Sequence, residues 1–315
     1  MAKLKKRLQQ VLIGTVAFGA GAWVLHQIRK SIYQDEEHAD ELHHVRTEDD
    51  LQLGIWRYRP ESTPGEPVLL VHGFGLNHRH LDVERDLSLA CYLRDQGYDV
   101  WAVDLRGRGA SELAEGSWNF DDYVQKDLPA VVNYIIENTQ YPKLHWAAYS
   151  MGAMLFYAFA GSTEHQDKIA SAVAGQGPFH GKSDTNGNDS NNTQATGYEY
   201  IVLPMMGFFR RLRIPWTGVA RFGAFWYPQL RRILPREFIH IGLNPDNITY
   251  ESLKKVSVRA VERVSPEVLA QFLDWALARH WTASDGTTDY RANIRNINVP
   301  TRVLAGAIDK LCPPH

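Results

Sequence analysis

The sequence predicts an α/β protein with a mostly parallel central sheet, flanking helices and an inserted, mainly helical cap. Apolar strand patterns alternate with helical patterns from residue 51 to about residue 178, an order typical of parallel sheets. This alternation stops across residues 179–292. A further apolar strand, at 299–309, follows the inserted segment and completes the expected core.

Segment 144–152 predicts an apolar strand that turns sharply into a helix. It reads Leu-His-Trp-Ala-Ala-Tyr-Ser-Met-Gly, and a helix-forming run follows directly. A serine on such a turn has strained backbone geometry, so small residues are needed two positions before it and two after it. Ala148 and Gly152 occupy those positions around Ser150. The pattern therefore predicts Ser150 as a nucleophile on a strand-to-helix elbow.

The strand at 68–75 predicts the groups that stabilise an oxyanion. It reads Val-Leu-Leu-Val-His-Gly-Phe-Gly. The flexible backbone of His72 and Gly73 can direct the Phe74 N–H into a cavity, and the Met151 N–H at the start of the elbow helix supplies a second donor. We expect these two amides to form an oxyanion hole.

Two more segments bear on the chemistry. Residues 98–111 predict a buried strand and a glycine-rich turn, but the Gly-Lys-Ser/Thr of a phosphate-binding loop is missing, so no nucleotide or other cofactor is expected. The strand at 299–309 ends in Asp309. A carboxylate at that place predicts the group that orients a catalytic histidine.

Together these segments resemble the α/β-hydrolase superfamily across about residues 45–178 and 293–315. The resemblance implies a core in two parts, 35–178 and 293–315, with a cap at 179–292 between them. It also implies acyl transfer by a serine, a histidine and an acid. In this sequence Ser150 would be the nucleophile and Asp309 the acid.

A finer similarity connects the chain with the acid lipase branch, which comprises the gastric and lysosomal lipases and their bacterial relatives. Residues 88–101, 127–130 and 143–146 are similar to that branch. There the serine follows Gly-His and precedes Gln-Gly, whereas this chain has Ala-Tyr at 148–149 and Met-Gly at 151–152. The departure leaves the nucleophile in place, and the resemblance implies an ester or lipid substrate.

The catalytic histidine is the part of the triad that this sequence does not place. In the family order it follows the acid, usually by a few tens of residues, and His315 lies only six residues after Asp309. We therefore expect a fragment whose histidine lies beyond His315. The alternatives are His315 itself or a cap histidine, His240 or His280.

The predicted function is the hydrolysis of carboxylic esters with apolar or lipid-like groups. An acyltransferase would use the same residues, and a non-catalytic, membrane-tethered lipid-binding protein is the rival from another class. A zinc hydrolase is disfavoured: His78, His80 and Asp82 form a His-x-His-x-Asp pattern, but Val83 stands where a further histidine belongs. No metal is expected.

Composition agrees with one catalytic domain. The 315 residues are 44% hydrophobic, and the net charge of −2 argues against a nucleic-acid partner. Cys91, in a predicted helix, and Cys312 give neither a disulfide framework nor a metal spacing. Residues 181–197 predict a mobile loop. The remaining cap interleaves aromatic residues with arginines, which predicts a cap core or, alternatively, a surface that docks on an anionic bilayer.

Residues 1–34 predict a membrane anchor. Basic residues at 3–7 precede an apolar stretch from Val11 to Leu25, which is shorter than the span of about 20 residues that a bilayer needs. The position of the basic residues favours an uncleaved single-pass anchor with a cytoplasmic N-terminus and a non-cytoplasmic catalytic domain. The alternative is a cleaved signal and a secreted or periplasmic protein. The sequence predicts no oligomeric state.

Overall fold

The computed structural model describes most of the expected core and the last part of the expected cap. The described residues are 37–61, 65–175, 177, 223, 226–227, 232, 247–278, 280–307 and 309. The expected anchor at 1–34 and the expected loop at 181–197 lie outside them. Among the described residues, no helix is long and apolar enough to cross a membrane.

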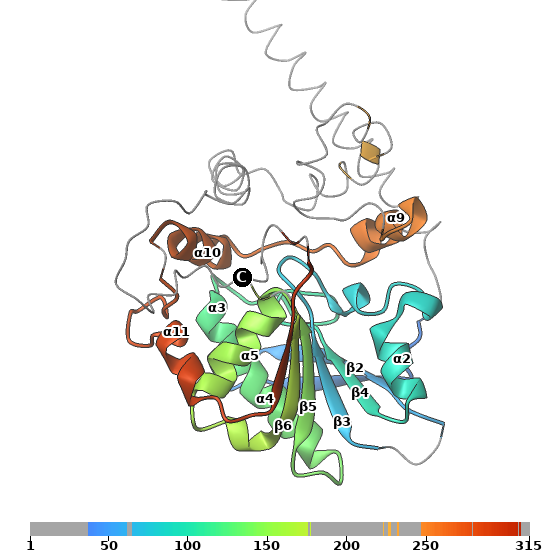
Figure 1. The fold of residues 1–315 in the computed structure, drawn as a ribbon, viewed down its shortest axis with the longest axis horizontal. Helices are drawn as coiled ribbons and strands as arrows, with labels where there is room; N and C mark the ends of the chain where they lie inside the picture. The colour runs from blue at the N-terminus through green and yellow to red at the C-terminus, as the bar shows by residue number, and fades with distance from the viewer. Residues whose placement is uncertain are drawn as a thin grey trace, which may run out of the picture. The chain divides into compact units, whose positions relative to one another are not determined.

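The strands of the described chain form one seven-stranded sheet in the order β1-β2-β4-β3-β5-β6-β7 (Figure 1). The pairs β1–β2 and β2–β4 are antiparallel, and the four remaining pairs are parallel. The predicted mostly parallel sheet is confirmed. The strands are β1 (Glu41–Arg46), β2 (Gln52–Tyr58), β3 (Pro67–Val71), β4 (Asp99–Val103), β5 (Leu144–Tyr149), β6 (Ile169–Gly175) and β7 (Thr301–Leu304).

β3 and β4 form the buried centre of the sheet. They read Pro-Val-Leu-Leu-Val and Asp-Val-Trp-Ala-Val, and every residue of both strands is buried. Helices cover both faces of a parallel sheet, so its central strands need apolar residues on both sides. Leu69 and Val71 accordingly join the core cluster of α5, whereas Val68 and Leu70 join the cluster that contains Cys91 of α2.

The helices divide between the two faces, as Figure 1 shows: α2 lies on one side, and α4, α5 and α11 lie on the other. α5 is apolar around its whole circumference, and all its residues are buried. The helix that the sequence predicts around Cys91 is confirmed as α2. The helices and short turns are η1 (His78–His80), η2 (Arg85–Leu87), α2 (Leu89–Asp95), α3 (Phe120–Asp122), the π-helical turn η3 (Tyr123–Asp127), α4 (Leu128–Glu137), α5 (Met151–Gly161), η4 (Gln166–Lys168), α9 (Tyr250–Arg259), α10 (Pro266–Ala278), α11 (Tyr290–Asn293) and η6 (Ile294–Asn296).

The chain between α9 and α10 contacts the loop that follows β3. Leu76 and Val261 form an antiparallel bridge between these two segments. Residues 75–77 and 260–262 are therefore fixed to each other, although they lie far apart in the sequence. Two backbone hydrogen bonds flank the bridge, from Asn77 N–H to Ala260 O (3.0 Å) and from Glu262 N–H to Gly75 O (2.8 Å).

Candidate active site

Ser150 lies on the turn between β5 and α5 in a strained conformation. Its φ is 55° and its ψ is −119°, and Asp50 is the other described non-glycine residue with a positive φ. Side chains rarely adopt this region unless the surroundings impose it. Here the Ser150 N–H donates to Gly175 O of β6 at 2.8 Å, and the Ser150 carbonyl accepts the Ala153 N–H at 3.0 Å. The elbow is thus held by the neighbouring strand and by the first turn of α5.

Gly152 allows α5 to pass close to β3. A Cβ atom at Gly152 would lie 2.4 Å from Val71 O and 2.9 Å from His72 O, which is closer than real Cβ contacts. Both of these atoms belong to the backbone and have little freedom to withdraw. The close approach explains in physical terms why the position two after the serine carries glycine.

The loop after β3 lies directly against the serine. A Cβ atom on Gly73 would stand 3.3 Å from Ser150 Cβ. The next residue, Phe74, packs its ring against Phe272 of α10 with ring centroids 5.1 Å apart. Met151 is fully buried as the first residue of α5. The structure therefore brings the two predicted oxyanion-hole residues to the segments that flank Ser150.

His72 fixes this loop as a neutral imidazole. Its Nδ1 lies 2.9 Å from Gly73 O, and its Nε2 lies 3.3 Å from the Leu105 backbone N, which donates to it. Both bonds form only when the proton is on Nδ1. Burial lowers the pKa of His72 to about 4. His72 therefore connects the loop after β3 to the chain after β4.

Asp309 follows β7, two strands away from β5. β6 pairs with β5 on one side and with β7 on the other, in parallel, so Ser150 and Asp309 both follow the carboxyl ends of their strands. The Asp309 N–H donates to Gly306 O at 3.0 Å, which forms a turn directly after the strand. His280 is exposed in the segment after α10. His240 and His315 lie outside the described residues.

The His-x-His-x-Asp pattern does not converge on one point. His78 Nδ1 lies 3.0 Å from both carboxylate oxygens of Asp104. The His80 ring packs against the Tyr149 ring at a centroid distance of 5.2 Å. Asp82 turns to other partners. The three residues that the sequence compares with a zinc site therefore make three separate sets of contacts.

Asp82 belongs instead to a group with the partly exposed His38 and the buried Cys91, whose potential ligand atoms lie within 4.8 Å of one another. Asp82 Oδ1 is 2.7 Å from His38 Nδ1, and Oδ2 accepts the Tyr58 O–H at 2.9 Å. Burial raises the pKa of the Cys91 thiol, which keeps it protonated near neutral pH. A hydrogen-bonded cluster accounts for these contacts, which tie the start of the described chain to the core.

Asp104, directly after β4, is a buried centre of hydrogen bonds that the sequence reasoning missed. Its carboxylate accepts the Trp56 Nε1–H (2.9 Å), the His78 N–H (2.8 Å) and the Ala110 N–H (2.9 Å). Burial alone would raise the pKa of Asp104, but His78 and these hydrogen bonds hold it below its ordinary value. A Cβ on Gly109 would lie 2.0 Å from Asp104 Oδ2. The signal was a carboxylate placed just before a glycine-rich turn.

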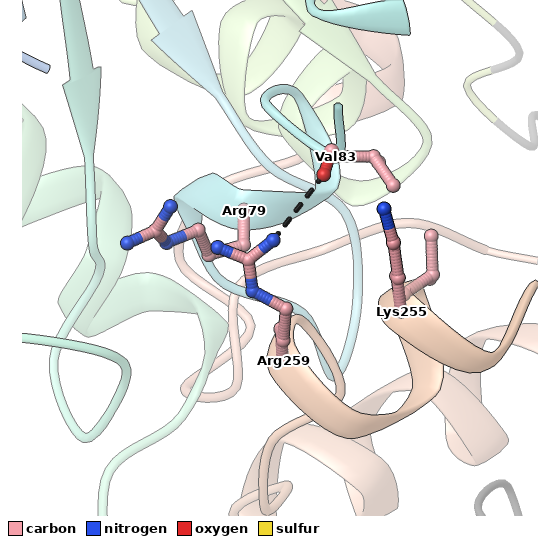
Figure 2. A pocket seen from close by; sticks show the side chains of 5 residues that line it. Arg79, Val83, Lys255 and Arg259 are labelled. Carbon is pink, nitrogen blue, oxygen red and sulfur yellow. Dashed lines mark hydrogen bonds between the residues drawn. The ribbon is translucent and has the colours of Figure 1, made fainter. Parts of the chain in front are cut away.

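A shallow pocket lies where α9 meets η1, and Figure 2 shows it. Three of the residues that line it are basic. Arg259 Nη1 donates to Val83 O at 3.3 Å, Lys255 Nζ lies 3.6 Å from a Glu84 oxygen, and Arg79 pairs with Glu37. The remaining lining residues are Val83 and Val256. Each of the three cations therefore has a partner within the protein. We interpret the pocket as part of the packing between α9 and the core.

The sheet order, the strained serine and the glycine-backed loop together define the protein as an α/β-hydrolase. The family model described as serine aminopeptidase, S33, matches residues 62–315. The chain belongs to this family.

Lipases are prominent among its relatives. Lipase 1 of Drosophila melanogaster is 32% identical over 168 residues, covering 46% of this chain and 38% of the relative. Human lipase member M is 25% identical, covering 90% of this chain and 74% of the relative. Rat gastric triacylglycerol lipase is 31% identical, covering 41% and 37%. These relatives confirm the resemblance to acid lipases, although the chain spans only about two fifths of two of them.

Solved structures agree on the fold. An esterase from Thermogutta terrifontis has a TM-score of 0.53 at 21% identity, covering 87% of this chain and 83% of the esterase. A bacterial membrane phospholipase A has a TM-score of 0.53 at 17% identity, covering 98% and 84%. At these identities the likeness establishes the α/β-hydrolase architecture and nothing finer.

Proposed function

We propose that the protein is a serine hydrolase that cleaves carboxylic esters with apolar or lipid-like groups. The observation that carries the proposal is the conformation of Ser150, with φ 55° and the backbone of Gly73 against its Cβ. A strained, glycine-flanked serine is the arrangement that presents an oxygen nucleophile beside two backbone amides. The lipase relatives support the same reaction class.

In this mechanism the Ser150 hydroxyl oxygen attacks the ester carbonyl carbon while a histidine takes its proton. The amides of Phe74 and Met151 hydrogen-bond to the oxyanion that forms. The ester C–O bond then breaks, and the histidine returns the proton to the departing alcohol. Water, deprotonated by the same histidine, attacks the acyl-enzyme and releases the acid together with Ser150.

The base in this proposal is a histidine that follows Asp309, in the family's order of serine, acid and histidine. The buried His72 is unsuited to the role, because both of its ring nitrogens fix the loop after β3. Asp309 would orient the base and stabilise its charged form.

The apolar part of the substrate is inferred from rings beside the elbow. Phe74 contacts Phe272, which in turn contacts Phe120 and Trp275 at centroid distances of 6.1 Å and 5.1 Å. An acyl chain that enters beside Phe74 would meet aromatic carbon rather than charge. Each buried methylene contributes about 0.8 kcal/mol to binding.

Fluorophosphonate labelling tests the reaction. The natural full-length protein should be labelled at Ser150 and should hydrolyse 4-nitrophenyl esters, and Ser150→Ala should lose both, with a fall in rate of several orders of magnitude. Ser162→Ala, at the other end of α5, is the matched control and should keep both. A wild type that is neither labelled nor active would favour the lipid-binding alternative. Esters formed with an added alcohol would favour the acyltransferase.

We also infer that residues 1–34 anchor the protein in a membrane, with the catalytic domain on the non-cytoplasmic side. The basic residues before the apolar stretch support this orientation. Carbonate extraction of cell membranes should leave the full-length protein in the pellet and release a variant that lacks 1–34. Release of both proteins would refute the anchor.

A further inference from the structure

Arg108 is a buried arginine whose charged group has no partner in the described chain. Its exposed fraction is 1%, and Nε, Nη1 and Nη2 are all buried without a hydrogen-bond acceptor. A guanidinium carries five N–H donors and stays charged at every physiological pH. Burying such a group without an acceptor is strongly unfavourable, so the position calls for an anion.

Arg106, two residues earlier in the same turn, shows what a buried arginine needs in this fold. Its exposed fraction is also small, at 2%, but its guanidinium contacts two carboxylates. Nε donates to Asp127 at 2.8 Å, and Nη1 and Nη2 donate to Asp49 at 2.9 Å and 3.1 Å. The turn thus carries one arginine with hydrogen-bond acceptors among the described residues and one without.

The backbone of Arg108 is connected to the serine through Leu105 and His72. Its N–H donates to Leu105 O at 3.0 Å, and the Leu105 N–H donates to His72 Nε2 at 3.3 Å. His72 precedes Gly73, which lies against Ser150. The turn that carries Arg108 and the loop that carries the oxyanion hole follow neighbouring parallel strands, β4 and β3.

No carboxylate among the described residues around this turn accepts a hydrogen bond from the Arg108 guanidinium. The Asp104 carboxylate already receives hydrogen bonds from Trp56, His78 and Ala110. The positive charge of Arg108 reaches His72, where it adds to the lowering of the pKa by burial. An anionic ligand held by Arg108 would therefore lie close to the loop that the substrate must approach.

We propose that Arg108 binds an anionic group of the substrate, a carboxylate or a phosphate, so that the preferred ester combines an apolar chain with a negative charge. This proposal rests on the proposed esterase function and names its substrate class. Arginine matches both anions because its planar fork donates two parallel hydrogen bonds. The aromatic rings around Phe74 and Phe272 would hold the apolar part.

The test compares matched esters on the natural full-length protein. The neutral substrate is 4-nitrophenyl hexanoate, and the anionic one is the 4-nitrophenyl monoester of hexanedioic acid, which has the same acyl length and a terminal carboxylate. A third ester of equal length ends in a phosphate. The ratio of kcat/KM for anionic over neutral ester should exceed one in the wild type. Arg108→Met should reduce that ratio about 10- to 100-fold, the value of a charge-assisted hydrogen bond.

The ester whose ratio falls further identifies the anion as carboxylate or phosphate. Arg108→Lys, which keeps the charge without the fork, should give an intermediate ratio. An unchanged ratio in active Arg108→Met protein would overturn the proposal and leave the esterase function intact. The same holds if both variants fail to fold, because Arg108 would then be structural. A wild type inactive on all three esters would refute the proposed function itself.

Discussion

The strands that lead to Ser150 and to Asp309 lie two places apart in one parallel sheet, yet their surroundings differ. β5 runs into α5, where all residues are buried, and its serine is fixed by β6 and by the loop after β3. All four residues of β7 are exposed, with Val303 at 63%. A strained conformation persists only where packing imposes it. Ser150 is therefore fixed by the described core, whereas the strand that leads to Asp309 is exposed.

The largest effect should come from filling the close contact between α5 and the end of β3 beside Ser150. Gly152→Ala places a methyl group 2.4 Å from Val71 O, so β3 and α5 must move apart. We expect a loss of at least about 3 kcal/mol in the free energy of unfolding, measured by urea denaturation. Gly175→Ala on β6 is the control, because its nearest neighbour, Ala148 O, would lie at 3.4 Å. If Gly152→Ala and Gly175→Ala lowered the free energy of unfolding equally, the expected difference between the two glycines would be wrong.

His72→Ala should have an intermediate effect that depends on pH. The variant loses hydrogen bonds to Gly73 and Leu105, which we expect to cost about 2–3 kcal/mol at pH 7.5. In the folded wild type the pKa of His72 falls from 6.5 to about 4, so only the unfolded chain binds a proton between these values. Its stabilising contribution is therefore complete above about pH 6.5 and declines as the pH falls towards 4.

The difference in unfolding free energy between wild type and His72→Ala should accordingly shrink between pH 7.5 and pH 4.5. His145→Ala is the control, since this half-buried β5 histidine contacts Ser171 and Glu66 and not the loop after β3. At pH 7.5, His145→Ala should lower the free energy of unfolding by less than His72→Ala does. A difference that stays constant with pH would show that His72 is not held neutral.

The smallest effect should appear on β7. Val303→Thr changes an exposed side chain and should alter the free energy of unfolding by no more than about 0.5 kcal/mol. The same change at Val71, which is fully buried on β3, should cost about 1–3 kcal/mol because its hydroxyl needs a partner. Chemical denaturation of both variants checks the contrast. A large loss at Val303 would mean that β7 is covered in solution.

The central strands and the elbow could be predicted because their signals are local. β3 and β4 are continuous apolar runs, and the small residues around Ser150 are imposed by a turn within a few positions. β1 escaped prediction because its sequence, Glu-Leu-His-His-Val-Arg, is mostly polar. It becomes a strand through pairing with β2, where Glu41 faces Arg57 and binds it at 3.4 Å.

Non-local contacts explain what was missed in the site. Asp104 and Arg108 looked like parts of an ordinary glycine-rich turn, because the sequence around them does not indicate which residues lie against them in the fold. The role of Asp104 depends on Trp56 and His78, which the order β2-β4-β3 brings beside it. The fold places a carboxylate against the Arg106 guanidinium, whereas none among the described residues accepts a hydrogen bond from Arg108. Such pairings follow from strand order, which local patterns do not encode.

The bridge between Leu76 and Val261 joins the loop after β3 to the chain between α9 and α10. Residues 75–77 directly follow the Phe74 amide, and residues 260–262 connect α9 with α10. A displacement of α9 or α10 would therefore be transmitted through this backbone to the loop after β3. The orientation of the Phe74 amide is thereby coupled to the placement of two helices that follow it by more than 170 residues.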